Sequence, residues 1–328
     1  MEAQEYVSVP VATLIANSVP DFALYLTHSD YPGRRVLYRK QGLVLSKDHL
    51  ACLQRHGVDH VYILVQDRPL QHRYMVESAR QLLDDPATPA PQKAAIIYEF
   101  SKSAVQCAFD EPCEQNIKTC RDLAQEQVRY VVSDPQAMAS LLRIISHDYY
   151  TYTHSVNVCS FTVALCRRAG LDDLERLKVI GIGAMLHDVG KSQINRAIIN
   201  KPGQLSPLER KEIRRHPELG VALLTHTSPV PVEAEELELV LGHHEKCDGS
   251  GYPGGLAADG LSLPVRACAI TDVFDALTTH RSYKSARSAF DSLNLMQRKM
   301  SRQLDPALLA EFIRLIGEAS REAARLAA

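Results

Sequence analysis

Seven histidines and aspartates lie within apolar, helix-forming sequence of this 328-residue chain. Polar side chains are costly to bury unless they are paired or coordinated, so this set limits the chain to folds that bring its members together. At its centre is GIGAMLHDVGK, in which an apolar helical segment runs into His187 and Asp188. Gly190, where a left-handed helix cap is easily adopted, and Lys191 follow. The other members are His154, His216, His243, His244 and Asp272.

A single His-Asp pair at a helix end is more often a hydrogen-bonded structural pair than a metal site. Each of the other polar residues could likewise be structural on its own. Structural hydrogen bonding does not explain why all seven of these residues lie within apolar helices. The sequence therefore predicts a metal-binding cluster.

The histidines nearest to this motif are predicted to lie on helices. His154 lies near the start of a core helix that ends at Gly170. In LSPLERKEIRRHPELG, Ser206 and Glu209 form a capping box, and the proline between them suits the first helical position. We therefore expect His216 about two turns into that helix.

The segment ELELVLGHHEKCDGSGYPGGL is predicted to be a helix followed by a glycine-rich loop. Adjacent helical residues point about 100° apart, so His243 and His244 are expected to serve two ions or two faces of a cluster. The glycines around Tyr252, among them Gly251, suit a loop that approaches a ligand closely.

A later helix, PVRACAITDVFDALTTHRSYK, carries Asp272 and Asp275 on one face among apolar residues. Buried carboxylates require a metal or another cation as partner. Arg281 and Lys284 follow one turn apart, and two such cations suit phosphate oxygens.

Composition limits the classes of function. A net charge of -2 gives no electrostatic reason to bind a nucleic-acid polymer or an anionic membrane. No apolar run is long enough to span a membrane. The eight cysteines form no CxxC pair and no secretory leader precedes them, so we expect reduced thiols and a cytoplasmic protein.

Three regions are expected along the chain. Residues 1–70 contain four short β-branched and aromatic runs and one helix between Ser46 and Gly57, which predicts a small α/β domain. Its role is either that of a sensory, regulatory or dimerising module or that of a structural cap on the second domain. Residues 71–135 are predicted to form a helical linker, either carrying a dimer interface or simply packed. Residues 136–328 are predicted to be all helix, so the fold class is mostly α.

Several motifs occur in a fixed order over roughly residues 145–315: YTYTHS, GAMLHDVGK, KPG, LSPLE, HPELG, HHEKCDGSGYP, ITDVFDALT and RSYK. In this order they resemble the HD-GYP domain, a subgroup of the HD metal-dependent phosphohydrolase superfamily. The resemblance implies a helical domain with a metal centre that hydrolyses cyclic di-GMP to pGpG, often continuing to GMP.

The resemblance also implies roles for individual residues. Asp188 would bridge two metals, and Lys191 would stand near the attacked phosphate as the second catalytic residue. The implied metal ligands are His154, His187, Asp188, His216, His243, His244 and Asp272, and the expected substrate contacts are Gly251, Tyr252, Asp275, Arg281 and Lys284.

Two positions depart from the family pattern. Members with three metals carry a glutamate where this chain has Tyr150, which favours two metals here. The usual Arg-Pro-Tyr-Lys element has Ser282 in place of proline, so both cations are kept but the rigid residue is lost.

The chemistry agrees with this interpretation. Two divalent ions lower the pKa of a bridging water and stabilise charge on phosphoryl oxygens. Histidine and carboxylate ligands suit Fe, Mn or Zn, and we favour Fe or Mn.

Three alternatives remain for function. Besides an active phosphodiesterase, the chain could be a catalytically weak cyclic di-GMP-binding module that signals through partners, although it lacks no ligand. An HD phosphohydrolase for another nucleotide fits the GYP loop less well. We also expect a homodimer through the N-terminal or linker helices, and signalling partners such as GGDEF proteins.

Overall fold

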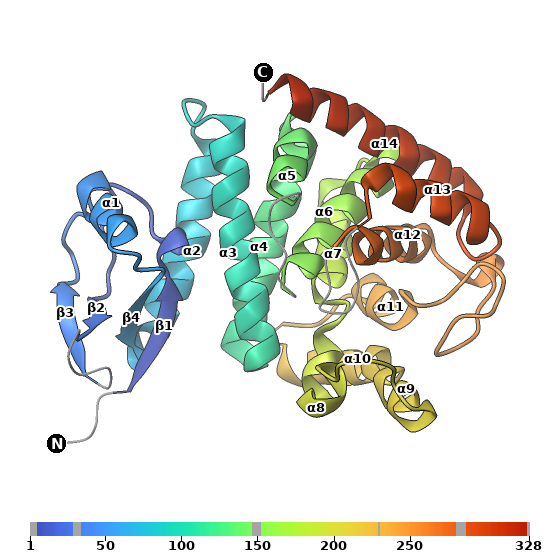
Figure 1. Cartoon of the computed structure of the whole chain (residues 1–328), viewed down its shortest axis with the longest axis horizontal. Helices are drawn as coiled ribbons and strands as arrows, with labels where there is room; N and C mark the ends of the chain where they lie inside the picture. Colours follow the sequence, from blue (N-terminus) through green and yellow to red (C-terminus); the bar gives the residue numbers. More distant parts are fainter. Residues whose placement is uncertain (1–4, 29–33, 146–151, 229, 280–286, 327–328) are drawn as a thin grey trace. The chain divides into compact units, whose positions relative to one another are not determined.

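The computed structural model describes residues 5–28, 34–145, 152–228, 230–279 and 287–326 (Figure 1). The chain divides into two compact units, Met1–Thr88 and Pro89–Ala328. The stretch 71–135, which we predicted to be one linker, is therefore shared between the units. Its first helix belongs to the first unit, and its other two helices pack into the second.

The first unit contains a four-stranded antiparallel sheet in the order β1-β4-β2-β3. Each strand overlaps one of the four predicted β-branched runs, which confirms the predicted α/β unit. The strands are β1 (Tyr6–Pro10), β2 (Leu24–Thr27), β3 (Arg35–Arg39) and β4 (His60–Leu64), and the helices are α1 (Lys47–Arg55) and α2 (Arg68–Asp84).

Local sequence determines both ends of α1. The Ser46 side chain accepts a hydrogen bond from the His49 backbone N–H, and the His49 side chain accepts one from the Ser46 N–H, which completes a capping box. Gly57 has a positive φ of 65° just after the helix, a conformation that costs glycine least. Leu53 of this helix joins the buried core of the sheet.

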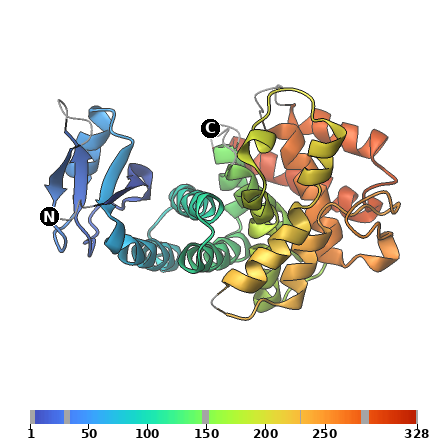
Figure 2. The ribbon, with the colours of Figure 1, turned by 90° about the horizontal axis from the view of Figure 1, so that it is seen from below.

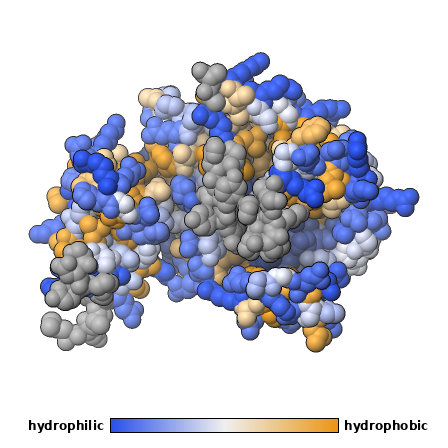
Figure 3. Space-filling view, viewed as in Figure 1, coloured by the Kyte–Doolittle hydropathy of each residue, from blue (hydrophilic) through white to orange (hydrophobic). Residues whose placement is uncertain are grey.

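Strand β3 is an edge of this sheet. Its side chains Val36 and Leu37 are 43% and 44% exposed, and Leu43 and Val44 beyond it are also exposed. In Figure 3, hydrophobic residues appear among the hydrophilic ones on the surface of this unit.

The second unit is helical, as predicted, and Figures 1 and 2 show its helices from two directions. Among the described helices, none is both long enough and apolar enough to cross a bilayer. The main helices are α3 (Ala90–Asp110), α4 (Glu114–Ser133), α5 (Ala137–Ile145), α6 (Thr153–Arg168), α7 (Leu174–Leu186), α8 (Arg196–Ile199), α9 (Pro207–Ile213), α10 (His216–Thr227), α11 (Ala234–Gly242), α12 (Leu263–Thr278), α13 (Ala289–Lys299) and α14 (Pro306–Arg325).

Helix α6 is the centre of this unit, because it packs against α3, α4, α7, α12 and α14. Phe161 of α6, Phe274 of α12 and Phe312 of α14 meet edge to face, with ring centroids 5.0 to 5.8 Å apart. Such pairs contribute beyond simple burial. This packing fixes the two helices that carry His154 and Asp272.

A buried ion pair joins α4 to α11. Arg121 is 7% exposed and Glu236 is completely buried, and the guanidinium donates to the carboxylate. Burial raises the pKa of Glu236 to about 7, even though Arg121 opposes that rise. Helix α11 leads directly to His243, so this pair helps to hold a predicted metal ligand in place.

We expect Arg121→Met to lower the free energy of unfolding by about 3–5 kcal/mol, because Glu236 then stays buried without its counter-charge. A carboxyl group with a raised pKa binds more protons in the folded than in the unfolded chain, so its contribution to stability falls as pH rises toward about 7. The loss in the variant should therefore be larger at pH 8 than at pH 5. Urea unfolding of wild type and variant at both pH values measures this loss in the free energy of unfolding.

The double variant Arg121→Met, Glu236→Leu is the matched control. It removes both charges, so it should recover most of the lost stability. If the double variant were as unstable as the single one, the loss would come from packing and not from the unpaired carboxylate.

Candidate metal centre

The HDVGK motif continues past the end of α7. The helix ends at Leu186, and η3 (Val189–Gln193) follows as a 3-10 helix. Gly190 is not among the residues with positive φ, so the predicted left-handed cap was wrong. A Cβ at Gly190 would lie 2.0 Å from the His216 carbonyl oxygen and 2.4 Å from the Gly220 nitrogen. Glycine is needed there because two backbones touch.

Three buried histidines have one orientation in common. His187, His216 and His243 each direct Nδ1 to the carbonyl oxygen three residues earlier, at 2.7 to 2.8 Å. A carbonyl can only accept, so Nδ1 carries the proton and Nε2 presents a lone pair. This arrangement is typical of histidines that bind a metal.

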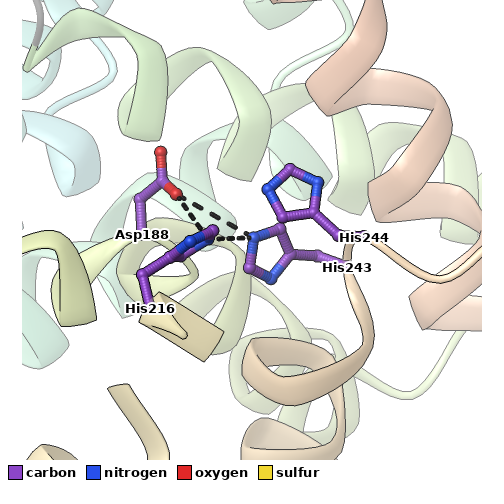
Figure 4. Close-up of side chains that lie close together, drawn as sticks. All are labelled: Asp188, His216, His243 and His244. Carbon is purple, nitrogen blue, oxygen red and sulfur yellow. Dashed lines mark hydrogen bonds and ion pairs between the residues drawn. The ribbon is translucent and has the colours of Figure 1, made fainter. Parts of the chain in front are cut away.

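Two of these histidines, His216 and His243, lie beside the carboxylate of Asp188, as Figure 4 shows. The Nε2 atoms of His216 and His243 are 3.1 Å apart, and Asp188 Oδ1 lies 3.2 and 3.9 Å from them. Among the described residues, His187 Nε2 and Asp188 Oδ1 are buried without a hydrogen-bond partner. Converging acceptors repel one another unless a cation lies between them, so these residues fit a metal ion.

Electrostatics also favour metal binding. Burial, together with the neighbouring histidines, holds the pKa of His243 well below its usual range. Burial lowers the pKa of His244 to about 4. Both rings are therefore neutral at pH 7, and a neutral imidazole is the form that coordinates a metal.

A second group of ligand atoms shares Asp188. His154 Nε2 lies 3.1 Å from Asp272 Oδ1 and 3.8 Å from Asp188 Oδ2, and His187 Nε2 lies 3.4 Å from Asp188 Oδ2. Asp188 thus faces one group with each oxygen. Burial alone would lower the pKa of His154, but Asp272 and Asp275 raise it to about 10. The carboxylates thus favour a cation at this position.

Asp275 lies behind His154. Its completely buried carboxylate accepts hydrogen bonds from His154 Nδ1 at 2.6 Å and from Asn157 Nδ2 at 2.7 Å. Tyr98 of α3 donates to Asn157 Oδ1 at 3.0 Å. The geometry therefore favours orientation of His154 by Asp275, in place of the substrate contact that we predicted.

Two expectations about helical position were incorrect. His216 is the first residue of α10 and does not lie two turns into α9, which ends at Ile213. Helix α11 ends at Gly242, so helical spacing does not separate the next two side chains. His243 and His244 therefore offer atoms to the same group, and His244 Nδ1 also lies 3.6 Å from Asp272 Oδ2.

Lys191 contacts the shared carboxylate, with Nζ 2.5 Å from Asp188 Oδ2. Burial alone would raise the pKa of Asp188, but Lys191 and His187 hold it well below its usual range. Asp188 is therefore ionised, which is the form in which a carboxylate would bind a metal.

Glu245 is a residue that sequence reasoning missed. It is 2% exposed, and its carboxylate accepts hydrogen bonds from the backbone N–H groups of Gly254, Gly255 and Leu256 at 2.5 to 3.0 Å. It therefore fixes the glycine-rich loop. Its only signal in the sequence was its position between the histidine pair and that loop.

The loop holds Tyr252 against His244, a predicted metal ligand. The Tyr252 ring stacks on His244 with centroids 4.8 Å apart and an interplanar angle of 29°. A Cβ at Gly251 would lie 2.5 Å from Glu245 Cα, so packing against this backbone accounts for that glycine. Arg281, Lys284 and Tyr150 lie outside the described residues.

Comparisons with known proteins agree with this geometry. The family model of the HD domain matches residues 132–308. Cyclic di-GMP phosphodiesterase PA4108 of Pseudomonas aeruginosa is 35% identical over 244 residues, which cover 71% of this chain and 58% of that protein. 3'3'-cGAMP-specific phosphodiesterase 3 of Vibrio cholerae is 34% identical over 161 residues, covering 49% and 34%.

Another relative is the cyclic di-GMP phosphodiesterase response regulator RpfG of Xanthomonas campestris, 29% identical over 257 residues that cover 76% of this chain and 65% of that protein. The matches thus span between a third and two thirds of these relatives. Among solved structures, Bd1817, an HDG"Y"P protein from Bdellovibrio bacteriovorus, has a TM-score of 0.70 and 21% identity. That match covers 95% of this chain and 100% of that one, so the two proteins have a common fold.

Proposed function

This chain belongs to the HD domain family and carries the motifs of its HD-GYP subgroup, and from that membership we propose that it is a metal-dependent cyclic di-GMP phosphodiesterase. The observation that carries the proposal is the meeting of three buried histidine lone pairs beside Asp188. The names of the matched relatives support a cyclic dinucleotide as the substrate.

The residues of the cluster have different roles in the proposed hydrolysis. When bound, the metal ions supply Lewis-acid stabilisation of the phosphoryl oxygens and a water of lowered pKa. Asp188 orients both halves of the ligand set, and Asp275 orients the His154 ring. Lys191 brings a positive charge to the same carboxylate, where it can neutralise charge that develops on the phosphate. The products are pGpG and, after a second cleavage, GMP.

We propose Tyr252, Arg281 and Lys284 as substrate contacts. The ring of Tyr252 beside His244 supports its assignment, and the spacing of the two cations in the sequence supports theirs. Homodimerisation through the N-terminal or linker helices, and GGDEF proteins as partners, stay predictions.

We expect the purified protein to hold two transition-metal ions per chain, Fe or Mn in preference to Zn. Two groups of ligand atoms share Asp188, and Tyr150 replaces the glutamate of three-metal members. Elemental analysis of protein prepared without oxygen measures the number. Three tightly bound ions would show that the inference from Tyr150 is incorrect.

Turnover on metal-loaded protein tests the proposed function. Cyclic di-GMP, 3'3'-cGAMP and linear dinucleotides are incubated separately, and products are separated by chromatography. We expect cyclic di-GMP to give pGpG first. Tight binding of cyclic di-GMP without product would instead identify a binding module, and cleavage of other nucleotides alone would identify a different phosphohydrolase.

A further inference from the structure

The short turn between α9 and α10 is fixed by a predicted metal ligand. His216 Nδ1 donates to the carbonyl oxygen of Ile213 at 2.7 Å, and the N–H of Arg214 donates to the carbonyl oxygen of Arg210 at 3.0 Å. Arg214 is the C-cap residue of α9. Its backbone therefore has a defined position relative to the metal centre.

Tyr252 approaches the same turn from the glycine-rich loop. Its backbone N–H donates to the His244 carbonyl oxygen at 3.3 Å, and its ring lies 6.5 Å from the His216 ring. Glu245 holds the following residues of the loop in place. Two segments, each attached to a predicted metal ligand, thus meet at this ring.

Arg214 lies over that ring. Its guanidinium carbon is 5.2 Å from the Tyr252 ring centroid, within the range of a cation–π contact. The side chain is exposed, and within the described parts of the chain it forms no ion pair. By contrast, the next residue, Arg215, pairs with Glu212 at 3.1 Å.

An arginine of this kind is suited to bind an anion. The guanidinium is planar and permanently charged, and its paired N–H donors match the oxygens of a phosphate. Stacking on Tyr252 limits the orientations of the Arg214 side chain, so less conformational entropy is lost when the guanidinium binds a phosphate. Lys191 contacts Asp188 and is already assigned to the phosphate that is cleaved.

We propose that Arg214, held on the face of Tyr252, binds the second phosphodiester of a cyclic dinucleotide while the first is cleaved at the metal centre. The proposal rests on the proposed function, because only a substrate with two phosphates occupies both positions. It makes Arg214 a substrate-binding residue that favours cyclic dinucleotides over simple phosphodiesters.

Steady-state kinetics of metal-loaded Arg214→Ala tests the proposal. We expect KM for cyclic di-GMP to rise about tenfold with little change in kcat, as for a contact made equally in ground and transition states. Metal content and hydrolysis of bis(p-nitrophenyl) phosphate, which has a single phosphodiester, should be unchanged. Arg214→Lys keeps the positive charge but not the paired N–H donors of the guanidinium. Its KM for cyclic di-GMP should therefore lie between those of wild type and Arg214→Ala. The neighbouring Arg215→Ala is the matched control and should equal wild type.

The outcomes separate this proposal from the proposed function. If wild type cleaves cyclic di-GMP and Arg214→Ala has the same KM, the Arg214 assignment alone is overturned. An equal rise in KM for cyclic di-GMP and 3'3'-cGAMP supports the phosphate contact, whereas a rise for cyclic di-GMP alone would point to guanine and overturn it. If wild type cleaves only bis(p-nitrophenyl) phosphate and binds no cyclic dinucleotide in calorimetry, both proposals fail.

Discussion

Asp188→Ala should abolish metal retention and reduce cyclic di-GMP hydrolysis by a factor on the order of 1,000 or more, because several kcal/mol of transition-state stabilisation depend on the ions. Asp188 is the residue common to both groups of ligand atoms. Without it, two cations lose the anion between them, and the histidine lone pairs face one another uncompensated. Elemental analysis and turnover are measured on the same preparation.

Two further variants make this result interpretable. Asp188→Asn keeps the shape of the side chain but removes its charge, so it should fold and still lose metal. Asp172→Ala removes an exposed aspartate just before α7 and should behave as wild type. Full metal content and activity in Asp188→Ala would show that the centre is assigned to the wrong residues.

Gly190→Ala should lower the free energy of unfolding by about 3 kcal/mol or more, which is the upper range for overpacking. The added Cβ would lie 2.0 Å from the His216 carbonyl oxygen and 2.4 Å from the Gly220 nitrogen. Both are backbone atoms, so no side chain can rotate to relieve the contact. The backbone must therefore move to relieve the contact, and this moves His216, so metal content should fall as well. Thermal unfolding and elemental analysis test the two effects.

Gly317→Ala is the matched control for this substitution. Gly317 lies within α14, where the nearest atom to an added Cβ is the end of the Arg321 side chain at 4.0 Å. Alanine should therefore stabilise that helix by about 0.5–1 kcal/mol. Wild-type stability and metal content in Gly190→Ala would contradict the close contact between η3 and α10.

Local sequence was sufficient to predict much of the fold. Ser206 forms the predicted capping box, and Ser46 caps the helix that was predicted to follow it, because a cap depends only on residues within one helical turn. The four strands also overlap the predicted runs. The extent of the second unit was not predictable in this way, because α3 and α4 join it through packing with helices far along the chain.

The identity of the predicted ligands came from residue type and motif order, but their geometry required the fold. Helical spacing separated His243 from His244 in the prediction, whereas the helix ends at Gly242 and both rings turn to one centre. The roles of Asp275 and Glu245 depend on hydrogen bonds to His154 and to the loop backbone. No local pattern distinguishes such a carboxylate from one that contacts substrate.

We propose that this histidine and aspartate cluster binds the metal that supports cyclic di-GMP hydrolysis. The most direct test is to titrate Mn²⁺ or Fe²⁺ into metal-free protein and to follow bound metal and pGpG formation in the same samples. We expect hydrolysis to rise with bound metal and to level off at two ions per chain. Two bound ions with no hydrolysis of cyclic di-GMP would contradict the claim.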